Sequence, residues 1–298
     1  MTGPVAVVGG LAELGTRHDV LICDIWGVLH DGVRAFEPAA DALVRFRAAP
    51  AAGGMRRVIL LTNAPRPWAQ VQRQLDRLGV PRHAYDAIVT SGDLTRRLIS
   101  ERRGEVVHHL GPERDLPTFE GTDPVFGTLE AADYVVCTGL AEDERETLAD
   151  YAERLARMRS RDLTMVCANP DLVVERGDSL VECAGALALA YEELGGTVVY
   201  AGKPHAPVYD LALARAAALG GGGEVAKDRV LAIGDALRTD VAGARGYGLA
   251  SLFVARGIHA GEMDDGPPEG RTERIAGWLG AQPVRPDYVI GDLVWRAE

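Results

Sequence analysis

The carboxylate of Asp24 is the side chain whose sequence context most clearly suggests chemistry. It follows the apolar run Val20–Cys23, and Gly27 lies shortly after it. Such a run predicts a buried strand, and α/β proteins bind their ligands at the carboxyl ends of these strands. Asp24 could therefore be a nucleophile or a metal ligand, but it could equally cap the following helix. On its own it leaves these three roles open.

Two further peptides carry groups that suit an anionic ligand. The run Val58–Thr62 ends in a hydroxyl, and Asn63 adds an amide at the predicted start of a helix, where backbone N–H groups hold anionic oxygens. Lys203 lies in the Gly- and Pro-containing turn Tyr200–His205, which would hold its ammonium near a charged centre. The alternatives are an ordinary helix cap at Thr62 and a surface lysine.

A second pair of carboxylates follows another apolar run. Val230–Gly234 is followed by Asp235, and Asp240 comes five residues later. Paired carboxylates at a strand end suit a hard cation that prefers oxygen ligands. The alternative is one capping aspartate and one solvated aspartate.

Short apolar strands alternate with helical patterns around these residues. The expected strands end in small or polar residues, and the expected helices have apolar residues three and four positions apart. This alternation predicts a doubly wound α/β core. The strands are expected at Val20–Cys23, Val58–Thr62, Val230–Gly234, Leu249–Val254 and Tyr288–Ile290, and the helices at Pro67–Leu78 and Pro207–Leu219.

The middle third of the chain predicts an inserted α/β domain. We place it at residues 92–196, so that residues 1–91 and 197–298 form the core. Within the insert, strands are expected at Glu105–Leu110, Tyr134–Thr138 and Thr164–Ala168, and helices at Glu142–Arg159 and Ser179–Leu194.

Composition narrows the choice of partners. The formal net charge is −11, which argues against nucleic acid and anionic membrane as partners, because both are bound through excess Lys and Arg. The first residues lack the basic and long apolar segments of a secretion signal or membrane span, so we expect a cytoplasmic protein. The four cysteines are far apart and are expected to be reduced, mostly buried thiols.

Four peptides, taken together and in their order along the chain, resemble the four signature motifs of the haloacid dehalogenase superfamily. They are centred on Asp24, Thr62, Lys203 and the pair Asp235 and Asp240. The resemblance implies an α/β fold with a doubly wound, mostly parallel Rossmann-like core and an inserted cap domain. The peptide Asn169-Pro-Asp171, followed by a helix after Cys183, resembles the C2-type cap of the class IIA branch. That branch includes p-nitrophenyl, pyridoxal and phosphoglycolate phosphatases, and its members often dimerise through their caps, so a homodimer is one expectation.

The resemblance also implies roles for individual residues. Asp24 would attack phosphorus and form an aspartyl-phosphate. Mg²⁺ would be held by the Asp24 and Asp235 carboxylates and the backbone carbonyl of Trp26, with Asp240 close by or acting through water. Thr62 and Lys203 would bind and stabilise the transferring phosphoryl group. Asn63 would help to shape or bind at the same loop, and Asn169, Asp171 and Arg238 are candidates for contacts to a small phosphorylated metabolite such as a sugar phosphate.

The sequence departs from the superfamily pattern at one position. The usual motif has a second aspartate two residues after the nucleophile, where it serves as general acid and base, but this chain has Trp26 there. His30 and Asp31 follow and are the nearby candidates for supplying a proton. Three functions therefore remain open: a phosphatase, a phosphotransferase that uses a long-lived aspartyl-phosphate, and a non-catalytic ligand-binding or regulatory protein.

Overall fold

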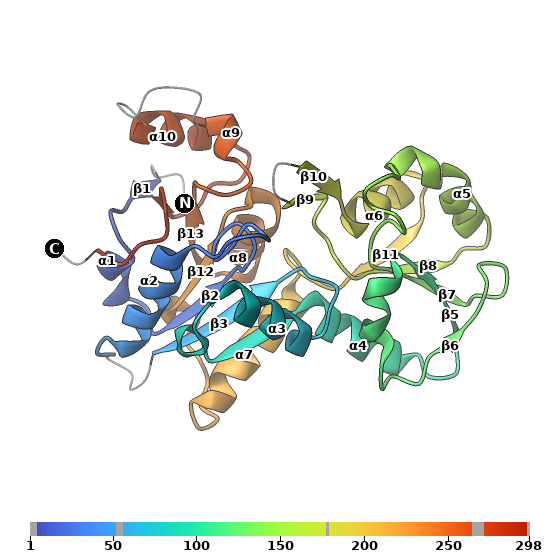
Figure 1. The fold of residues 1–298 in the computed structure, drawn as a ribbon, viewed down its shortest axis with the longest axis horizontal. Coiled ribbons are helices and arrows are strands. Elements are labelled where there is room, and N and C mark those ends of the chain that lie inside the picture. Colours follow the sequence, from blue (N-terminus) through green and yellow to red (C-terminus); the bar gives the residue numbers. More distant parts are fainter. Residues whose placement is uncertain (1–4, 52–55, 177–178, 264–270, 297–298) are drawn as a thin grey trace. The chain divides into compact units, whose positions relative to one another are not determined.

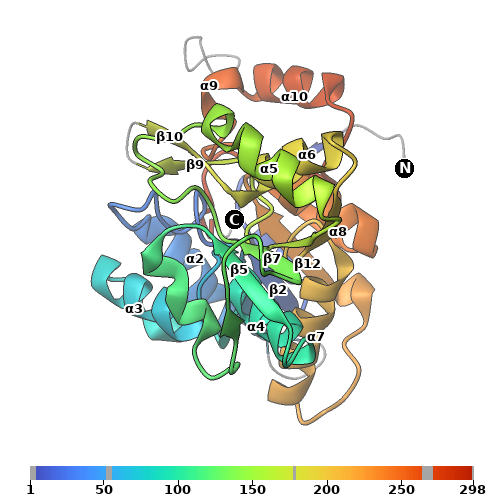
Figure 2. The same cartoon turned by 90° about the vertical axis from the view of Figure 1, so that its right-hand side faces the viewer.

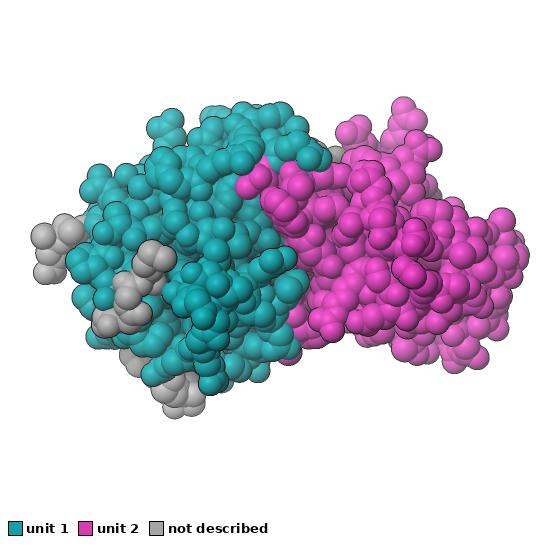
Figure 3. All heavy atoms as spheres, turned by 90° about the horizontal axis from the view of Figure 1, so that it is seen from below, with its two compact units in different colours: residues 1–61, 73–89, 209–298 teal, residues 62–72, 90–208 magenta. Residues whose placement is uncertain are grey.

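Contacts divide the chain into two compact units. The structure is a computed structural model that describes residues 5–51, 56–176, 179–263 and 271–296. The first unit comprises residues 1–61, 73–89 and 209–298, and the second comprises residues 62–72 and 90–208 (Figure 3). Each unit has its own parallel sheet and is described separately below.

The first unit is organised around a seven-stranded sheet (Figure 1). From β1 to β3 in sheet order, each strand is parallel to the next, and β2 lies between β12 and β3. Every residue of β2 and β12 is buried, as expected for strands covered on both faces. The strands, in sheet order, are β1 (Ala6–Val7), β14 (Tyr288–Ile290), β13 (Ala250–Val254), β12 (Val230–Gly234), β2 (Val20–Cys23), β3 (Arg57–Thr62) and β4 (Ala87–Thr90).

Helices connect the strands of this sheet, which confirms the predicted doubly wound core. Apolar residues of α10, β13 and β14 pack together in one cluster that includes Phe253, Leu279 and Val289. The helices are α1 (Ala12–Gly15), α2 (Glu37–Ala48), α3 (Trp68–Leu78), α7 (Ala206–Leu219), α8 (Ala242–Tyr247), α9 (Ala260–Met263) and α10 (Arg271–Ala281), with short turns η1 (Arg82–Ala84), η4 (Lys227–Arg229) and a π-helix η5 (Leu237–Val241).

The second unit has a five-stranded parallel sheet of its own. Its strands, in sheet order, are β11 (Thr197–Tyr200), β8 (Thr164–Cys167), β7 (Tyr134–Cys137), β5 (Val106–Leu110) and β6 (Val125–Phe126). A separate antiparallel hairpin joins β9 (Val173–Arg176) to β10 (Ser179–Glu182) (Figure 2). The inserted α/β domain expected from the sequence is therefore present as a sheet with its own helices.

Alternate residues of β7 and β8 enter two different apolar clusters. Val135 and Met165 pack with α5 (Ala152–Ser160) and α6 (Ala184–Glu193), whereas Val136 and Val166 pack with α4 (Ser91–Glu101). Because successive side chains of a strand point to opposite faces, helices cover both faces of this sheet. The remaining turns are η2 (Glu113–Phe119) and η3 (Leu148–Tyr151).

Two expected helices were wrong in extent. The helix expected from Glu142 begins only with η3, because Thr147 and Asp150 form a capping box that fixes its start. The helix expected from Ser179 begins only at Ala184, because residues 179–182 form strand β10. The apolar residues before Cys183 alternate along a strand and do not belong to the helical face.

The compact units differ in extent from the predicted insert at 92–196. Strand β11 pairs with β8 and therefore lies in the second unit, although residues 197–208 were assigned to the core. Residues 62–72 are also grouped with the second unit. These compact units do not by themselves define domains, so the predicted domain boundaries remain a prediction. All four cysteines are buried free thiols, and none of the helices in the described ranges has the length and apolar character needed to traverse a bilayer.

Candidate active site

Three buried carboxylates meet at the carboxyl ends of two neighbouring strands of the first unit. Asp24 follows β2, Asp235 follows β12, and Asp240 lies in η5. One carboxylate oxygen from each lies within 4.8 Å of the others, and the three residues are 5 to 8% exposed. The peptide predicted to carry the nucleophile and the peptide predicted to carry further metal ligands are therefore adjacent, as the sheet order requires.

Backbone hydrogen bonds hold Asp24 and Asp235 in this arrangement. The N–H of Asp24 donates to the carbonyl of Ile233 at 2.8 Å, which extends the β2–β12 pairing by one residue. The N–H of Ile258 donates to Asp235 Oδ2 at 2.8 Å. A Cβ at Gly27 or at Gly257 would overlap the Asp235 carboxylate, so both positions need glycine. Gly27 also has a φ of +77°, which favours glycine.

Asp240 is held by the turn that it helps to form. Its Oδ2 accepts the N–H of Ala236 at 3.1 Å, and a Cβ at Gly234 would overlap its carboxylate. The next N–H, of Leu237, donates to His259 Nε2 at 3.4 Å, while His259 Nδ1 lies 2.8 Å from Glu262 Oε1. Ile258 and His259 were not predicted as site residues, because nothing in their local sequence marks a segment that reaches back to β12.

The donor set of this cluster fits a hard divalent cation. Three carboxylates buried so close together repel one another, and a cation with oxygen preference would offset that repulsion. Asp24, Asp235 and Asp240 would hold this cation. Gly27 and Gly257 have no side chain, so their backbone can lie close to the Asp235 carboxylate.

The residue at the unusual position, Trp26, is packed within its own loop. Its indole meets the imidazole of His30 edge to face, with ring centroids 4.9 Å apart and an interplanar angle of 73°. A Cβ at Gly32, whose φ is +89°, would lie 2.7 Å from Trp26 Cζ2. The loop is closed by the N–H of Gly27, which donates to the His30 carbonyl at 2.8 Å.

The two nearby candidates for proton transfer have structural partners. His30 is 1% exposed, and its Nδ1 accepts the N–H of Gly32 at 2.9 Å. Burial lowers the pKa of His30 to about 4. Burial alone would raise the pKa of Asp31, but the N–H groups of Arg34 and Val33 donate to its Oδ1 and bring that pKa below its usual value.

A second group of predicted residues lies in the second unit around the amide of Asn63. Asn63 is 2% exposed. Its Nδ2 donates to Asp171 Oδ1 at 2.9 Å and to the Lys203 carbonyl at 3.1 Å. Its Oδ1 accepts the N–H of Lys203 at 2.8 Å and the hydroxyl of Ser91 at 3.3 Å. A side-chain amide has two donor hydrogens and two acceptor lone pairs, so these four bonds use its whole capacity.

The remaining predicted residues of the second unit have partners of their own. Thr62 is 6% exposed at the end of β3, and its hydroxyl accepts the N–H of Ala64 at 3.2 Å. Asn169 Oδ1 accepts the N–H of Asp171 at 3.2 Å. Lys203 is 3% exposed, in the turn after β11. Thr62, Asn63, Asn169, Asp171 and Lys203 therefore form one group within the second unit.

The predicted site residues thus fall into two groups, one in each unit. The first unit holds Asp24, Trp26, Asp235 and Asp240, together with Arg238, which is exposed on η5. The second unit holds the five residues around the Asn63 amide. The roles predicted for all of these residues remain predictions.

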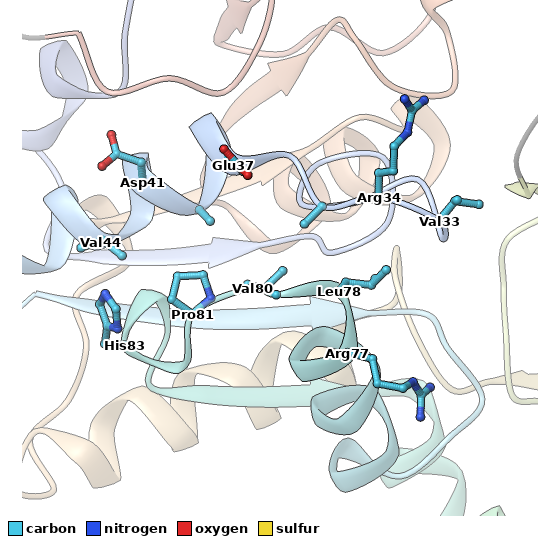
Figure 4. Close-up of a pocket in the computed structure, with 13 residues that line it drawn as sticks. Val33, Arg34, Glu37, Asp41, Val44, Arg77, Leu78, Val80, Pro81 and His83 are labelled. Carbon is cyan, nitrogen blue, oxygen red and sulfur yellow. The ribbon is translucent and has the colours of Figure 1, made fainter.

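A separate pocket of about 720 Å³ lies elsewhere in the first unit (Figure 4). Glu37, Asp41 and Val44 of α2 line one side, and Arg77, the segment from Leu78 to Pro81, and His83 line the other. The lining carries charges of both signs and includes none of the three clustered carboxylates. This pocket is therefore distinct from the acidic cluster.

The chain belongs to the haloacid dehalogenase-like hydrolase family. Residues 21–123 match the family model for haloacid dehalogenase-like hydrolases, and residues 200–295 match a second model of HAD-hydrolase-like proteins. These segments contain the peptides of Asp24, Thr62, Lys203 and Asp235, so the predicted membership is confirmed. No curated protein matched the chain.

Solved structures support the same assignment. A haloacid dehalogenase-like hydrolase from Brucella suis 1330 is 44% identical, with a TM-score of 0.83 over 96% of this chain and 100% of that one. Glycerol phosphate phosphatase from Mycobacterium tuberculosis, in complex with calcium, is 25% identical, with a TM-score of 0.66 over 95% of this chain and 75% of that one. A 4-nitrophenylphosphatase from Thermotoga maritima, 24% identical with a TM-score of 0.65 over 91% and 93%, shares the fold.

Proposed function

We propose that this protein is a magnesium-dependent phosphatase that acts on a small phosphate ester, a sugar phosphate or similar metabolite, through an aspartyl-phosphate intermediate. The observation that carries the proposal is the buried cluster of Asp24, Asp235 and Asp240 at the carboxyl ends of β2 and β12. The family membership supports hydrolysis as the reaction class.

Asp24 is the proposed nucleophile. Asp24 follows β2 directly, and the hydrogen bond from its N–H to the carbonyl of Ile233 fixes its backbone at the end of that strand. A carboxylate oxygen would form a bond to phosphorus as the ester oxygen departs, and water would then release phosphate and restore the carboxylate. The single-step displacement is thereby divided into two easier ones.

Magnesium is the proposed cation. Asp24 and Asp235 would hold it with the backbone carbonyl of Trp26, and Asp240 would support it directly or through water. When bound, it would neutralise negative charge near the nucleophile and so allow an anionic phosphate to approach. Support comes from the M. tuberculosis glycerol phosphate phosphatase, which has been crystallised with calcium and with magnesium.

Lys203 and Thr62 are the proposed contacts to the phosphoryl group. An ammonium and a hydroxyl are suited to the charge that develops on phosphoryl oxygens during transfer. Asn63 has the predicted place beside them, but its four hydrogen bonds to protein groups favour a positioning role. It would hold the backbone of Lys203 in place, while Asn169, Asp171 and Arg238 are proposed to select the rest of the substrate.

A phosphotransferase is the second candidate. The tryptophan at position 26 favours it, because the resembled motif has at that position the aspartate that activates water. A long-lived aspartyl-phosphate could pass its phosphoryl group to an alcohol. The third candidate is a non-catalytic protein that only binds the metal and an anion.

One screen separates the three candidates. The protein would be incubated with excess Mg²⁺ and sugar phosphates, nucleotides, pyridoxal phosphate, phosphoglycolate and 4-nitrophenyl phosphate, with and without added alcohols. Phosphate release supports the phosphatase, transfer that requires the alcohol supports the phosphotransferase, and binding without either product supports the third candidate. The expected homodimer and cytoplasmic location belong to the same proposal, and analytical ultracentrifugation tests the first.

A further inference from the structure

The loop that follows the proposed nucleophile is the place where the resembled motif carries the acid that protonates the leaving group. In a phosphate ester of an ordinary alcohol, the departing oxygen is a strong base and must be protonated as its bond to phosphorus breaks. In an acyl, enol or aryl phosphate, the oxygen departs as a stable anion. The structure describes every residue from Asp24 to Arg34, so the proton donors of this loop can be considered individually.

Trp26 occupies the position from which an acid would act, but its chemistry excludes that role. The indole has one N–H donor and no basic atom, so it can neither give up a proton readily nor take one from water. Its contacts with the His30 ring and with Gly32 keep the indole within the loop. A second residue would therefore have to replace the missing acid.

The geometry of His30 commits its ring to the loop. Nδ1 accepts the N–H of Gly32, so the hydrogen of the ring lies on Nε2. An acid would need a hydrogen on both nitrogens, and the hydrogen on Nδ1 would then face the N–H of Gly32. The ring is also 1% exposed. His30 therefore supports the indole and does not donate a proton.

Asp31 is used by the turn that follows. Its Oδ1 accepts the N–H groups of Val33 at 2.9 Å and Arg34 at 2.7 Å, and its Oδ2 lies 3.8 Å from the guanidinium of Arg34. These donors stabilise the carboxylate form. A carboxylate so held accepts hydrogen bonds and has no proton to give.

We infer that this protein acts on phosphoryl groups carried by a stable oxyanion, that is, on acyl, enol or aryl phosphates, and that it transfers them from alkyl esters only slowly. This inference rests on the proposed function and narrows its substrate class. In the first step a bond forms between an Asp24 oxygen and phosphorus. The bond from phosphorus to the leaving oxygen breaks, and that oxygen keeps the electron pair with no proton transferred. In the second step water attacks phosphorus, the bond from phosphorus to the Asp24 oxygen breaks and leaves its electron pair on the restored carboxylate, and a proton of the water passes to buffer or to the released phosphate.

The dependence of rate on leaving-group basicity tests the inference. With excess Mg²⁺, kcat/KM would be measured for a series of aryl phosphates, acetyl phosphate and an alkyl phosphate, because kcat/KM reports the first step even if the phosphoenzyme accumulates. We expect kcat/KM to fall steeply as the leaving group becomes more basic. An alkyl ester within tenfold of 4-nitrophenyl phosphate would overturn the inference.

Two variants assign the effect to position 26. Trp26→Asp supplies the missing acid, and Trp26→Asn is its matched control, with nearly the same size and no acid. A positioned acid is typically worth about 10²- to 10⁴-fold, so we expect Trp26→Asp to exceed Trp26→Asn by about 10²-fold on the alkyl ester and by far less on 4-nitrophenyl phosphate. Equally steep dependence in both variants would overturn the assignment to this position.

The outcome is separable from failure of the proposed function itself. Turnover with a shallow dependence on leaving group would refute the substrate class but leave the phosphatase intact. If no phosphate ester or acyl phosphate were turned over, and mass spectrometry found no phosphate on Asp24 after exposure to acetyl phosphate, the proposed function would be refuted.

Discussion

The indole of Trp26 lies edge to face against the imidazole of His30. The loop that carries both rings follows Asp24, which is one of the three clustered buried carboxylates. An edge-to-face aromatic pair typically contributes about 0.5–1.5 kcal/mol beyond the area that it buries. The loop therefore gains stability from the aromatic residue at position 26. The packing of Trp26 against His30 favours one defined conformation of this loop.

Asp24→Asn should remove phosphoryl transfer and leave the fold intact. The change is nearly isosteric, but the amide is not a nucleophile. Phosphate release and phosphoenzyme detected by mass spectrometry measure the effect, and circular dichroism checks the fold. Asp41→Asn is the matched control, because its side chain is 53% exposed on α2 and is not part of the cluster. Undiminished turnover in Asp24→Asn would refute the covalent mechanism.

Asp235→Asn should weaken Mg²⁺ binding by at least about tenfold, since one of few anionic ligands is lost. Calorimetry measures the affinity directly. Wild-type protein should also gain thermal stability on addition of Mg²⁺ and lose it again with a chelator, because a ligand that binds only the folded state stabilises that state. Asp292→Asn, with a side chain 47% exposed, is the control. An unchanged Mg²⁺ affinity in Asp235→Asn would rule out this residue as a ligand.

Gly27→Ala should weaken Mg²⁺ binding through sterics alone. The new methyl group would overlap the Asp235 carboxylate, and alanine would also be strained at a φ of +77° by about 1–2 kcal/mol. Gly79→Ala separates the two effects, because Gly79 has a φ of +83° and a methyl group there would meet no atom within 4 Å. Both variants should lose stability in urea unfolding, but only Gly27→Ala should lose metal affinity. Equal Mg²⁺ affinities in the two would contradict the steric argument.

Asn63→Ala should destabilise the second unit by about 2 kcal/mol or more, because buried groups lose hydrogen-bond partners. It should also lower kcat/KM, since the backbone of Lys203 loses two of its bonds. Asn169→Ala removes the same type of side chain, whose amide oxygen accepts the N–H of Asp171, and should cost less stability. Urea unfolding and steady-state kinetics measure both effects. A kcat/KM of Asn63→Ala equal to the wild-type value would contradict the positioning role.

Acidification should lower the stability of the five-stranded sheet of the second unit, because His109 lies on its strand β5. Burial, assisted by the charge of His108, lowers the pKa of His109 to about 4 from an ordinary 6.5. Between these values the unfolded state binds more protons, so stability falls as the pH drops from about 6.5 to about 4, by up to about 3 kcal/mol. Hydrogen exchange of the β5 and β7 amides measures the effect. His109→Gln should reduce this pH dependence, and an unchanged dependence would assign it to other groups.

The core strands could be predicted closely from sequence because they are short, apolar and buried on both faces. The expected runs Val20–Cys23 and Val230–Gly234 agree with β2 and β12 residue for residue. Periodicity alone did not indicate that these two strands are neighbours. The family resemblance implied only that Asp24 and Asp235 would share a metal ion, and the parallel pairing of the two strands explains why these residues meet.

The cap was less predictable because strand and helix patterns are ambiguous over short apolar runs. Ser179–Glu182 was assigned to a helix, yet it pairs with Val173–Arg176. The supporting contacts of the site were missed for a different reason. The bond from Ile258 to Asp235 joins segments 23 residues apart through a backbone N–H, and a backbone donor has no signature in the sequence.

The pairing of β2 with β12 has a consequence for how the protein is made. Val20 is aligned with Val230, so the sheet that carries the acidic cluster joins segments that are far apart along the chain. The strands of the five-stranded sheet of the second unit, in contrast, all lie between residues 106 and 200. Non-local pairings form late because they require closure of long loops, and domains generally fold as units during synthesis. On the ribosome, the five-stranded sheet of the second unit can therefore assemble before β2 pairs with β12, and the cluster of Asp24, Asp235 and Asp240 is among the last features to form.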